Sequence, residues 1–282
     1  MLRLTIVEPS AQAGEATLAA YADVYIWRDI VGRPCAYGHT VGGLHWIHWP
    51  RLASYCFDGS GTEVIAVPTT SSREDAVVDT FHRMVLPLAL QIRGREALHA
   101  SAVMIGDGVV GFCATSGIGK STLAYALDCF SACPQWSDDV LVFEVTSESI
   151  RAIPLPFSPR LAPEAAAAFR GTGSDRPATR PAQNRSETPA DIVALCLLAR
   201  RASRRGEAPG QIVHLSPKRA FPAVLAHAHC FSLLDAERKK RMIDHYLELV
   251  DRVPVFEISF EPGLEHLPSL ALRVAEAFAR GR

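Results

Sequence analysis

Apolar runs of strand length alternate with apolar positions at helical spacing along the last two thirds of the chain. Residues 98–105 and 109–113 are two such runs joined by Gly106-Asp107-Gly108, which predicts a β-hairpin. Further strands are expected at 140–143, 191–200 and 254–260, and helices at 122–129, 221–228, 236–250 and 270–279. This alternation predicts an α/β fold with some α+β character.

Residues 1–75 follow a different pattern, in which short apolar or aromatic runs are separated by turn residues. Strands are expected at 21–27, 45–49, 55–57 and 64–67, with turns at Gly42-Gly43 and 58–61. We therefore expect a small β-rich N-terminal module (1–75) before a larger domain (76–282). His39, His45 and His48 lie close together in the module, but their spacing matches no metal-binding pattern and favours surface or half-buried histidines.

Three segments of the larger domain have distinct patterns. Residues 76–92 have helical spacing, and Pro87 is expected to kink or split that helix. Residues 153–161 form a proline-stiffened loop before an Ala-rich helix. Residues 171–190, rich in Gly, Ser, Pro, Arg and Thr, are expected to form a mobile loop.

The composition is that of an ordinary globular protein, with 282 residues, 48% hydrophobic and 21% charged residues, and a net charge of −1. A charge so close to zero gives no reason to expect binding to nucleic acid or a membrane. Basic runs at 200–205 and 238–241 favour solvated surfaces, with contact to an acidic peptide or protein as the alternative. Neither a membrane-length apolar run nor a signal-peptide pattern occurs, and seven cysteines without a C-x-x-C pair favour reduced thiols, so we expect a cytoplasmic protein.

The strand predicted at 109–113 is followed by Ala114-Thr115-Ser116-Gly117-Ile118-Gly119-Lys120-Ser121, which fits the Walker A pattern with Ala in place of the first glycine. Small residues let successive backbone N–H groups surround phosphate oxygens, while the lysine contributes a positive charge and the last serine a hydroxyl for Mg²⁺. We expect ATP and Mg²⁺ as cofactors. The predicted nucleotide-binding residues are Ser116, Gly117, Ile118, Gly119, Lys120, Ser121 and Thr122.

Phosphoryl transfer also needs a carboxylate for the metal and a group that handles the nucleophile. Asp138 and Asp139 are the candidates, and they open an apolar strand where the usual Walker B acid closes one. Adjacent carboxylates disfavour joint ionisation, so a cation or an imidazolium is expected beside them.

Together these motifs resemble the catalytic domain of HPr kinase/phosphorylase, which is itself related to phosphoenolpyruvate carboxykinases. The resemblance covers residues 95–145 and rests on His99 before the hairpin, on the S-G-x-G-K-S loop and on the paired aspartates. The segment 98–103 is more similar to the shorter HPr-kinase-like proteins, which include kinases that phosphorylate a serine of lasso peptide precursors.

The resemblance implies a role for each matching residue. Asp138 matches the aspartate that deprotonates the acceptor serine, Asp139 the aspartate near the metal, and His99 the histidine that supports the catalytic aspartate. Thr122 stands where HPr kinases have Glu, and their E-[LIV]-R-G segment is absent. These departures weigh against HPr as the substrate, against reverse phosphorylase activity and against a hexamer.

Several basic and histidine residues remain candidates without a motif. Arg160, after the proline-stiffened turn, is a candidate for contact with phosphate or the acceptor, and Arg180 and Arg185 for a lid over the phosphates. For His227 and His229 a structural role is favoured.

The expected function is that of an ATP- and Mg²⁺-dependent kinase acting on a serine of a peptide or small protein, with a ribosomal peptide precursor favoured and the β-rich module helping to dock it. A nucleotide-binding scaffold without phosphotransfer and a kinase of a free small molecule such as serine are the alternatives. A homo-oligomer is left open.

Overall fold

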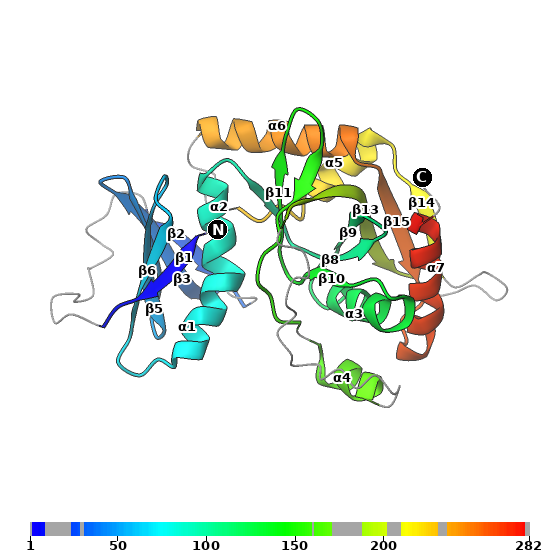
Figure 1. Cartoon of the computed structure of the whole chain (residues 1–282), viewed down its shortest axis with the longest axis horizontal. Helices are drawn as coiled ribbons and strands as arrows, with labels where there is room; N and C mark the ends of the chain where they lie inside the picture. Colours follow the sequence, from blue (N-terminus) through cyan, green and yellow to red (C-terminus); the bar gives the residue numbers. More distant parts are fainter. Residues whose placement is uncertain are drawn as a thin grey trace. The chain divides into compact units, whose positions relative to one another are not determined.

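The computed structural model describes residues 2–8, 24–28, 31–159, 161–170, 188–201, 210–230 and 236–279. The chain divides into two compact units, Met1–Gly94 and Arg95–Arg282 (Figure 1). The division lies later than the expected 75/76 boundary because the helical segment after residue 73 packs on the first sheet. One contact of that packing is the buried hydroxyl of Tyr55, which donates to the carbonyl oxygen of Val77 at 2.8 Å.

In the described part of the first unit, six strands form one sheet in the order β1-β6-β5-β4-β3-β2. Neighbouring strands are antiparallel except β1 and β6, which run parallel. The strands are β1 (Arg3–Ile6), β2 (Tyr25–Arg28), β3 (Pro34–Val41), β4 (Leu44–Trp49), β5 (Ala53–Asp58) and β6 (Glu63–Pro68). The predicted Gly42-Gly43 turn joins β3 to β4, with positive φ at both glycines. Strands β1 and β3 were not predicted, since β3 contains Pro34 and Gly38 and does not alternate cleanly.

The helical segment of the first unit runs through α1 (Glu74–Thr80), a π-helical turn (Phe81–Val85) and α2 (Leu86–Ile92). Pro87 lies in the first turn of α2. Proline has no N–H for the usual i→i−4 bond, and its ring crowds the preceding turn. The wide π-helical turn just before Pro87 accommodates both effects. The helix predicted to be kinked or split by Pro87 is therefore interrupted by this turn.

In the second unit the described strands form a nine-stranded sheet, with β10-β8-β9-β13-β12-β11-β7 as its main path and β15 and β14 attached through β13. At its centre β9, β13 and β15 are parallel. The strands are β7 (Glu96–Leu98), β8 (Ala100–Ile105), β9 (Gly108–Cys113), β10 (Gln135–Ser137), β11 (Leu141–Val145), β12 (Ile150–Ala152), β13 (Ala190–Arg200), β14 (Gln211–His214) and β15 (Val255–Phe260).

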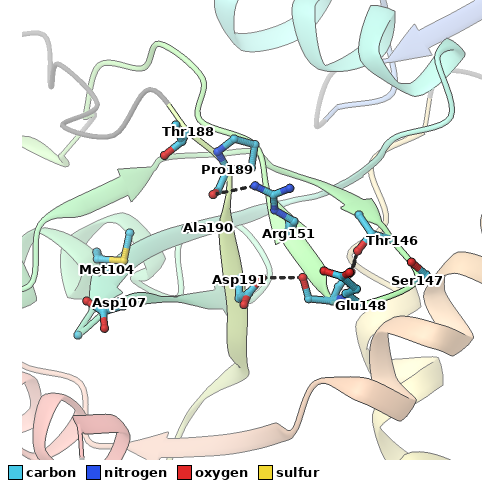
Figure 2. Close-up of a pocket in the computed structure, with 12 residues that line it drawn as sticks. Met104, Asp107, Thr146, Ser147, Glu148, Arg151, Thr188, Pro189, Ala190 and Asp191 are labelled. Carbon is cyan, nitrogen blue, oxygen red and sulfur yellow. Dashed lines mark hydrogen bonds between the residues drawn. The ribbon is translucent and has the colours of Figure 1, made fainter.

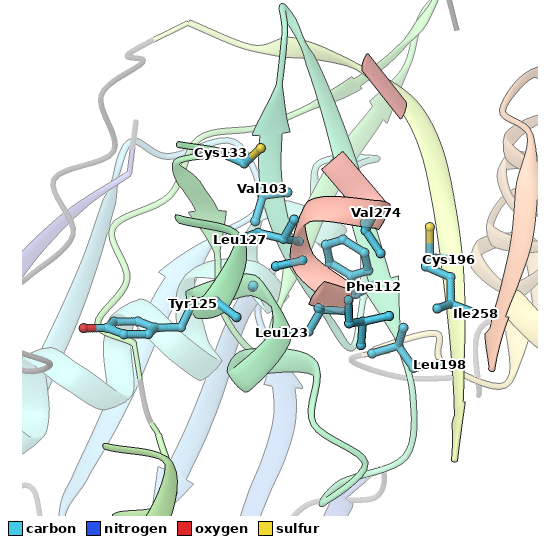
Figure 3. Packing of buried hydrophobic residues seen from close by; sticks show 14 of the residues in the cluster. Val103, Phe112, Leu123, Tyr125, Leu127, Cys133, Cys196, Leu198, Ile258 and Val274 are labelled. Carbon is cyan, nitrogen blue, oxygen red and sulfur yellow. The ribbon is translucent and has the colours of Figure 1, made fainter. Parts of the chain in front are cut away.

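Helices cover both faces of this sheet. On one face α3 (Lys120–Ser131) and α7 (Leu267–Ala279) share a core with Val110, Phe112 and Leu198 (Figure 3). On the other face α5 (Pro217–Leu225) and α6 (Ala236–Arg252) pack with Val109 and Leu195. The alternation of Val109 and Val110 between the faces follows the period-2 geometry of a strand. The Ala-rich helix predicted after the proline-stiffened loop is α4 (Pro163–Arg170).

Two predicted elements of this unit end differently in the structure. The predicted strand 98–105 breaks at His99, so that β7 pairs with β11 and β8 pairs with β9. The predicted helix 221–228 starts earlier and ends at Leu225, and Ala228 instead forms an isolated bridge with Leu98. The hairpin β8–β9 is confirmed. The mobile loop predicted at 171–190 falls mostly on residues 171–187, outside the described part of the chain.

All seven cysteines are described and are free, in agreement with the predicted reduced thiols. Within the described ranges, no helix combines the length and apolar character needed to span a membrane. In the first unit, His39 is buried and stacks on His48 at a ring distance of 5.1 Å. Among the described residues, no group of three or more His, Cys, Asp or Glu side chains is arranged to hold a metal ion.

Candidate functional site

The loop between β9 and α3 brings a helix N-terminus to the edge of the sheet. Gly117 has φ of 85° and Gly119 φ of 119°, conformations that favour glycine. A 3.3 Å bond from the N–H of Ile118 to the carbonyl oxygen of Thr115 closes the turn, and the N–H of Leu123 bonds the carbonyl oxygen of Gly119 in the first turn of α3. The first N–H groups of a helix have no intrahelical partner, so the N–H groups at Lys120 and Ser121 suit an anion.

Lys120 is the central cation of the site and is only 5% exposed. Its ammonium donates to the carbonyl oxygen of Ala114 at 2.8 Å and to Nε2 of His99 at 3.1 Å. Burial lowers the pKa of Lys120, while the nearby carboxylates of Asp139 and Asp138 oppose that shift. The cation expected beside the aspartate pair is therefore Lys120.

The contacts of His99 define its protonation state. Its Nδ1 lies 3.0 Å from the backbone carbonyl oxygen of Asp139, which can only accept, so Nδ1 carries the proton and Nε2 is free to accept from Lys120. Burial, and next the charge of Lys120, lower the pKa of His99. His99 is therefore a neutral imidazole and not an imidazolium. Its hydrogen bond to the aspartate pair is made to the backbone carbonyl oxygen of Asp139.

Asp138 and Asp139 lie in the connection between β10 and β11. Asp138 is 6% exposed, and its Oδ1 accepts a 2.8 Å bond from the hydroxyl of Ser101, a fully buried residue of β8. Asp139 is half-buried with φ of 68°, in the left-handed region that Asp tolerates better than most residues. The role of Ser101 was not predicted, because nothing in the sequence shows that β8 lies beside the aspartate pair.

Neighbouring segments hold His99 in place. The N–H of His99 donates to the carbonyl oxygen of His227 at 2.7 Å, and the N–H of His229 donates to Ala97 at 2.8 Å. These backbone bonds agree with the structural role predicted for His227 and His229. Burial lowers the pKa of His229 to about 4.

A buried ion pair fixes the strand that leads into His99. Glu96 of β7 is 1% exposed, and both of its oxygens accept bonds from Arg238 of α6 at 2.7 Å. His245 lies 3.0 Å from the same carboxylate. The prediction that the basic run 238–241 is only a solvated surface was therefore wrong for Arg238, whose partner is 142 residues away in the sequence.

His99, Lys120 and Asp139 line a cavity of about 410 Å³, whereas Asp138 is not one of its lining residues. His99, Asp139 and the loop residues form one part of its wall, and Pro262 and Leu264 form an apolar part. Arg200 also lines the cavity, and its guanidinium donates to the carbonyl oxygens of Gly117 and Ile118. Arg200 is exposed, in agreement at this position with the solvated surface predicted for the run 200–205, and it contacts the loop as well. The nucleotide-binding residues predicted at 116–122 all line the cavity.

The structure does not test the three other arginines that were predicted to contact phosphate or the acceptor. Arg160, Arg180 and Arg185 lie outside the described residues. Their predicted contacts with phosphate or the acceptor stay predictions.

A second pocket, of about 710 Å³, lies at the β8–β9 turn, at the opposite end of β9 from the loop (Figure 2). Asp107, Glu148 and Asp191 line it together with one guanidinium, that of Arg151, which donates to the carbonyl oxygen of Pro189 at 3.3 Å. Its excess of carboxylates makes it unsuited to phosphate, so the first cavity is the better nucleotide candidate.

The donors in the first cavity fit Mg²⁺. Magnesium in nucleotide sites is held by one or two protein oxygens, with phosphates and water completing its octahedron. Ser121 and Asp139, the predicted metal ligands, both line the cavity and offer a hydroxyl and a carboxylate. A site of this kind needs no cage of three protein ligands.

Comparison with known proteins gives likenesses at the level of structure alone. No family model matches the chain, and no curated protein matches its sequence. Among solved structures the chain is similar to the HPr(Ser) kinase/phosphatase from Coxiella burnetii, with 14% sequence identity and a TM-score of 0.34, over 64% of this chain and 95% of that one. A likeness this slight carries no weight for function.

Proposed function

We propose that the chain is an ATP- and Mg²⁺-dependent kinase that transfers the γ-phosphate to a serine hydroxyl of a peptide or small protein. The observation that carries the proposal is the environment of Lys120. Its ammonium lies at the start of α3 behind a glycine-rich loop, bonded to His99 and within the electrostatic reach of Asp138 and Asp139. A buried cation, a helix N-terminus and two carboxylates are the groups that phosphoryl transfer requires.

The loop would bind the phosphates through its backbone. The N–H groups at the start of α3 and the ammonium of Lys120 would hold phosphate oxygens, and Ser121 and Asp139 would hold Mg²⁺. When bound, Mg²⁺ neutralises part of the triphosphate charge. Lys120 already has a carbonyl and an imidazole as acceptors, so phosphate oxygens would replace or share existing bonds rather than meet an unsatisfied charge.

Asp138 would act as the general base. One of its oxygens accepts a hydrogen bond from the hydroxyl of Ser101, which orients the carboxylate. As the acceptor oxygen bonds to the γ-phosphorus, Asp138 would take the hydroxyl proton, and the bond from that phosphorus to the bridging oxygen would break to release ADP. His99 would orient Lys120 through its neutral Nε2.

The peptide acceptor is the finer part of the proposal. It is supported by the sequence resemblance of the segment 98–103 to short HPr-kinase-like proteins and by a β-rich first unit that offers a separate surface. Ribosomal peptide precursors are the favoured acceptors, and peptides encoded beside the gene are the first to test.

Incubation with γ-labelled ATP, Mg²⁺ and such peptides tests the reaction directly. We expect a labelled phosphoserine with the wild-type protein and no product with Asp138→Asn, which should still bind nucleotide. Asp251→Asn, at an exposed carboxylate of α6, is the control and should keep full transfer. Labelled product from Asp138→Asn would refute the base assignment. Nucleotide binding by the wild-type protein without transfer to any peptide would favour the scaffold, and labelled free serine would favour a small-molecule kinase.

A further inference from the structure

Arg200, the last residue of β13, lies beside the candidate phosphate loop. Its Nη2 donates to the carbonyl oxygen of Gly117 at 2.7 Å, and its Nε donates to that of Ile118 at 3.2 Å. These carbonyls belong to two consecutive peptide units of the loop. Arg200 is separated in the sequence from Gly117 by 83 positions and from Ile118 by 82.

The register of the central strands explains why this side chain reaches the loop. In the parallel pair β9–β13, Leu197 is opposite Cys113, the last residue before the loop. Strand β13 continues for three more residues and therefore runs alongside the loop. Cys196 and Leu198 face the core formed with α3 and α7, and Arg200 is next in that period-2 series (Figure 3). Its side chain is thus directed to the face where the loop turns into α3.

Peptide geometry gives the contact a consequence for the loop. In a planar trans peptide the C=O and N–H groups point in opposite directions. Holding the carbonyls of Gly117 and Ile118 toward Arg200 directs the N–H groups of Ile118 and Gly119 to the opposite side, where that of Ile118 bonds the carbonyl oxygen of Thr115. Because Gly117 and Gly119 make the backbone unusually permissive here, the loop needs an external restraint to keep those N–H groups aligned.

We propose that Arg200 is a positioning residue that holds the loop in its phosphate-binding conformation. The inference deepens the function proposed above and rests on it for its consequence, nucleotide affinity. The planar guanidinium offers two donors along one edge, so it can bond two carbonyls at once. A lysine would supply the same charge from a single nitrogen and could not reproduce that bridge.

Amide hydrogen exchange of the nucleotide-free protein tests the restraint without relying on catalysis. We expect faster exchange across residues 114–123 in both Arg200→Gln and Arg200→Lys. Arg201→Gln is the matched control. Arg201 is adjacent to Arg200 and is also exposed, and its replacement removes the same charge. It should exchange like the wild type. Thermal unfolding of each variant shows whether a change is confined to the loop, and Arg200→Lys remains available if Arg200→Gln does not fold.

Nucleotide binding then tests the consequence. Loss of two charge-assisted bonds is expected to raise the Kd for Mg²⁺–ATP about tenfold or more in both Arg200 variants, and less than about twofold in Arg201→Gln. Wild-type exchange in the Arg200 variants, or full affinity in Arg200→Lys, would overturn the inference. A wild-type protein that binds no Mg²⁺–ATP would overturn the proposed function, whereas the exchange comparison would still decide whether Arg200 holds the loop.

Discussion

The hydroxyl of Ser101 donates a 2.8 Å hydrogen bond to the carboxylate of Asp138, and both groups are buried. The bond joins β8 to the connection between β10 and β11, 37 positions apart in the sequence. A hydrogen bond to a buried carboxylate helps to fix the direction of both of its oxygens. Ser101 is therefore expected to position the proposed base.

Replacing Ser101 with Ala should lower kcat about tenfold or more, because hydrogen bonds to charged groups are worth about 1.5–3 kcal/mol. The Kd for Mg²⁺–ATP should stay within about twofold of the wild-type value, since Ser101 does not line the cavity. Steady-state kinetics and calorimetric titration separate the two quantities. Ser137→Ala is the control, because the buried hydroxyl of Ser137 has no hydrogen-bond partner among the residues that the structure describes. Equal losses in both serine variants would contradict the prediction.

His99→Gln should retain most of the nucleotide affinity that His99→Ala loses. Glutamine can donate to the Asp139 carbonyl and accept from Lys120, which are the two bonds that the neutral imidazole makes. We expect His99→Ala to raise the Kd for Mg²⁺–ATP about fivefold or more through a less ordered Lys120. Fluorescence titration with a labelled ATP analogue measures both variants. A loss in His99→Gln as large as in His99→Ala would show that imidazole itself is required.

Arg238→Met should destabilise the second unit by about 3 kcal/mol. The variant leaves the carboxylate of Glu96, only 1% exposed, without its bidentate partner. The double variant Glu96→Gln/Arg238→Met removes the unpaired charge and should recover much of that loss. Urea unfolding of the three proteins at neutral pH gives the comparison. A double variant as unstable as the single one would point to lost packing of the Arg238 stem instead.

The protein should lose stability as the pH falls from about 6.5 to 4, in part through His229. Burial lowers the pKa of His229 to about 4 in the folded state, from 6.5 when exposed. Within that window the unfolded chain binds the proton and the folded chain does not, so acid favours unfolding. At pH 4.5 this histidine alone costs about 2–3 kcal/mol relative to pH 7.5.

His229→Gln should therefore show a smaller loss of unfolding free energy between pH 7.5 and 4.5 than the wild type. Urea unfolding at the two pH values measures the loss. His266→Gln, at a more exposed histidine, serves as the control and should follow the wild type. A wild-type-sized loss in His229→Gln would mean that His229 is protonated in the folded protein.

Local features were predictable because their causes are local. The β8–β9 hairpin, the loop and the start of α3 follow from a Gly-Asp-Gly turn, an apolar run and small residues at fixed spacing. The break at His99 was not predictable, because the apolar run continues through it. The break arises because β7 pairs with β11 and because Leu98 forms an isolated bridge with Ala228. Both partners are distant in the sequence.

The parts of the candidate site are evident from residue types and their order: a phosphate loop, a lysine, a histidine and two aspartates. Their hydrogen-bond partners depend on the fold, and they are Ser101 for Asp138, Arg200 for the loop and a neutral His99 for Lys120. These contacts depend on strand order and register. A side chain's pKa and hydrogen bonds are set by neighbours that strand pairing, parallel or antiparallel, brings from far along the chain, and residue spacing carries no record of them.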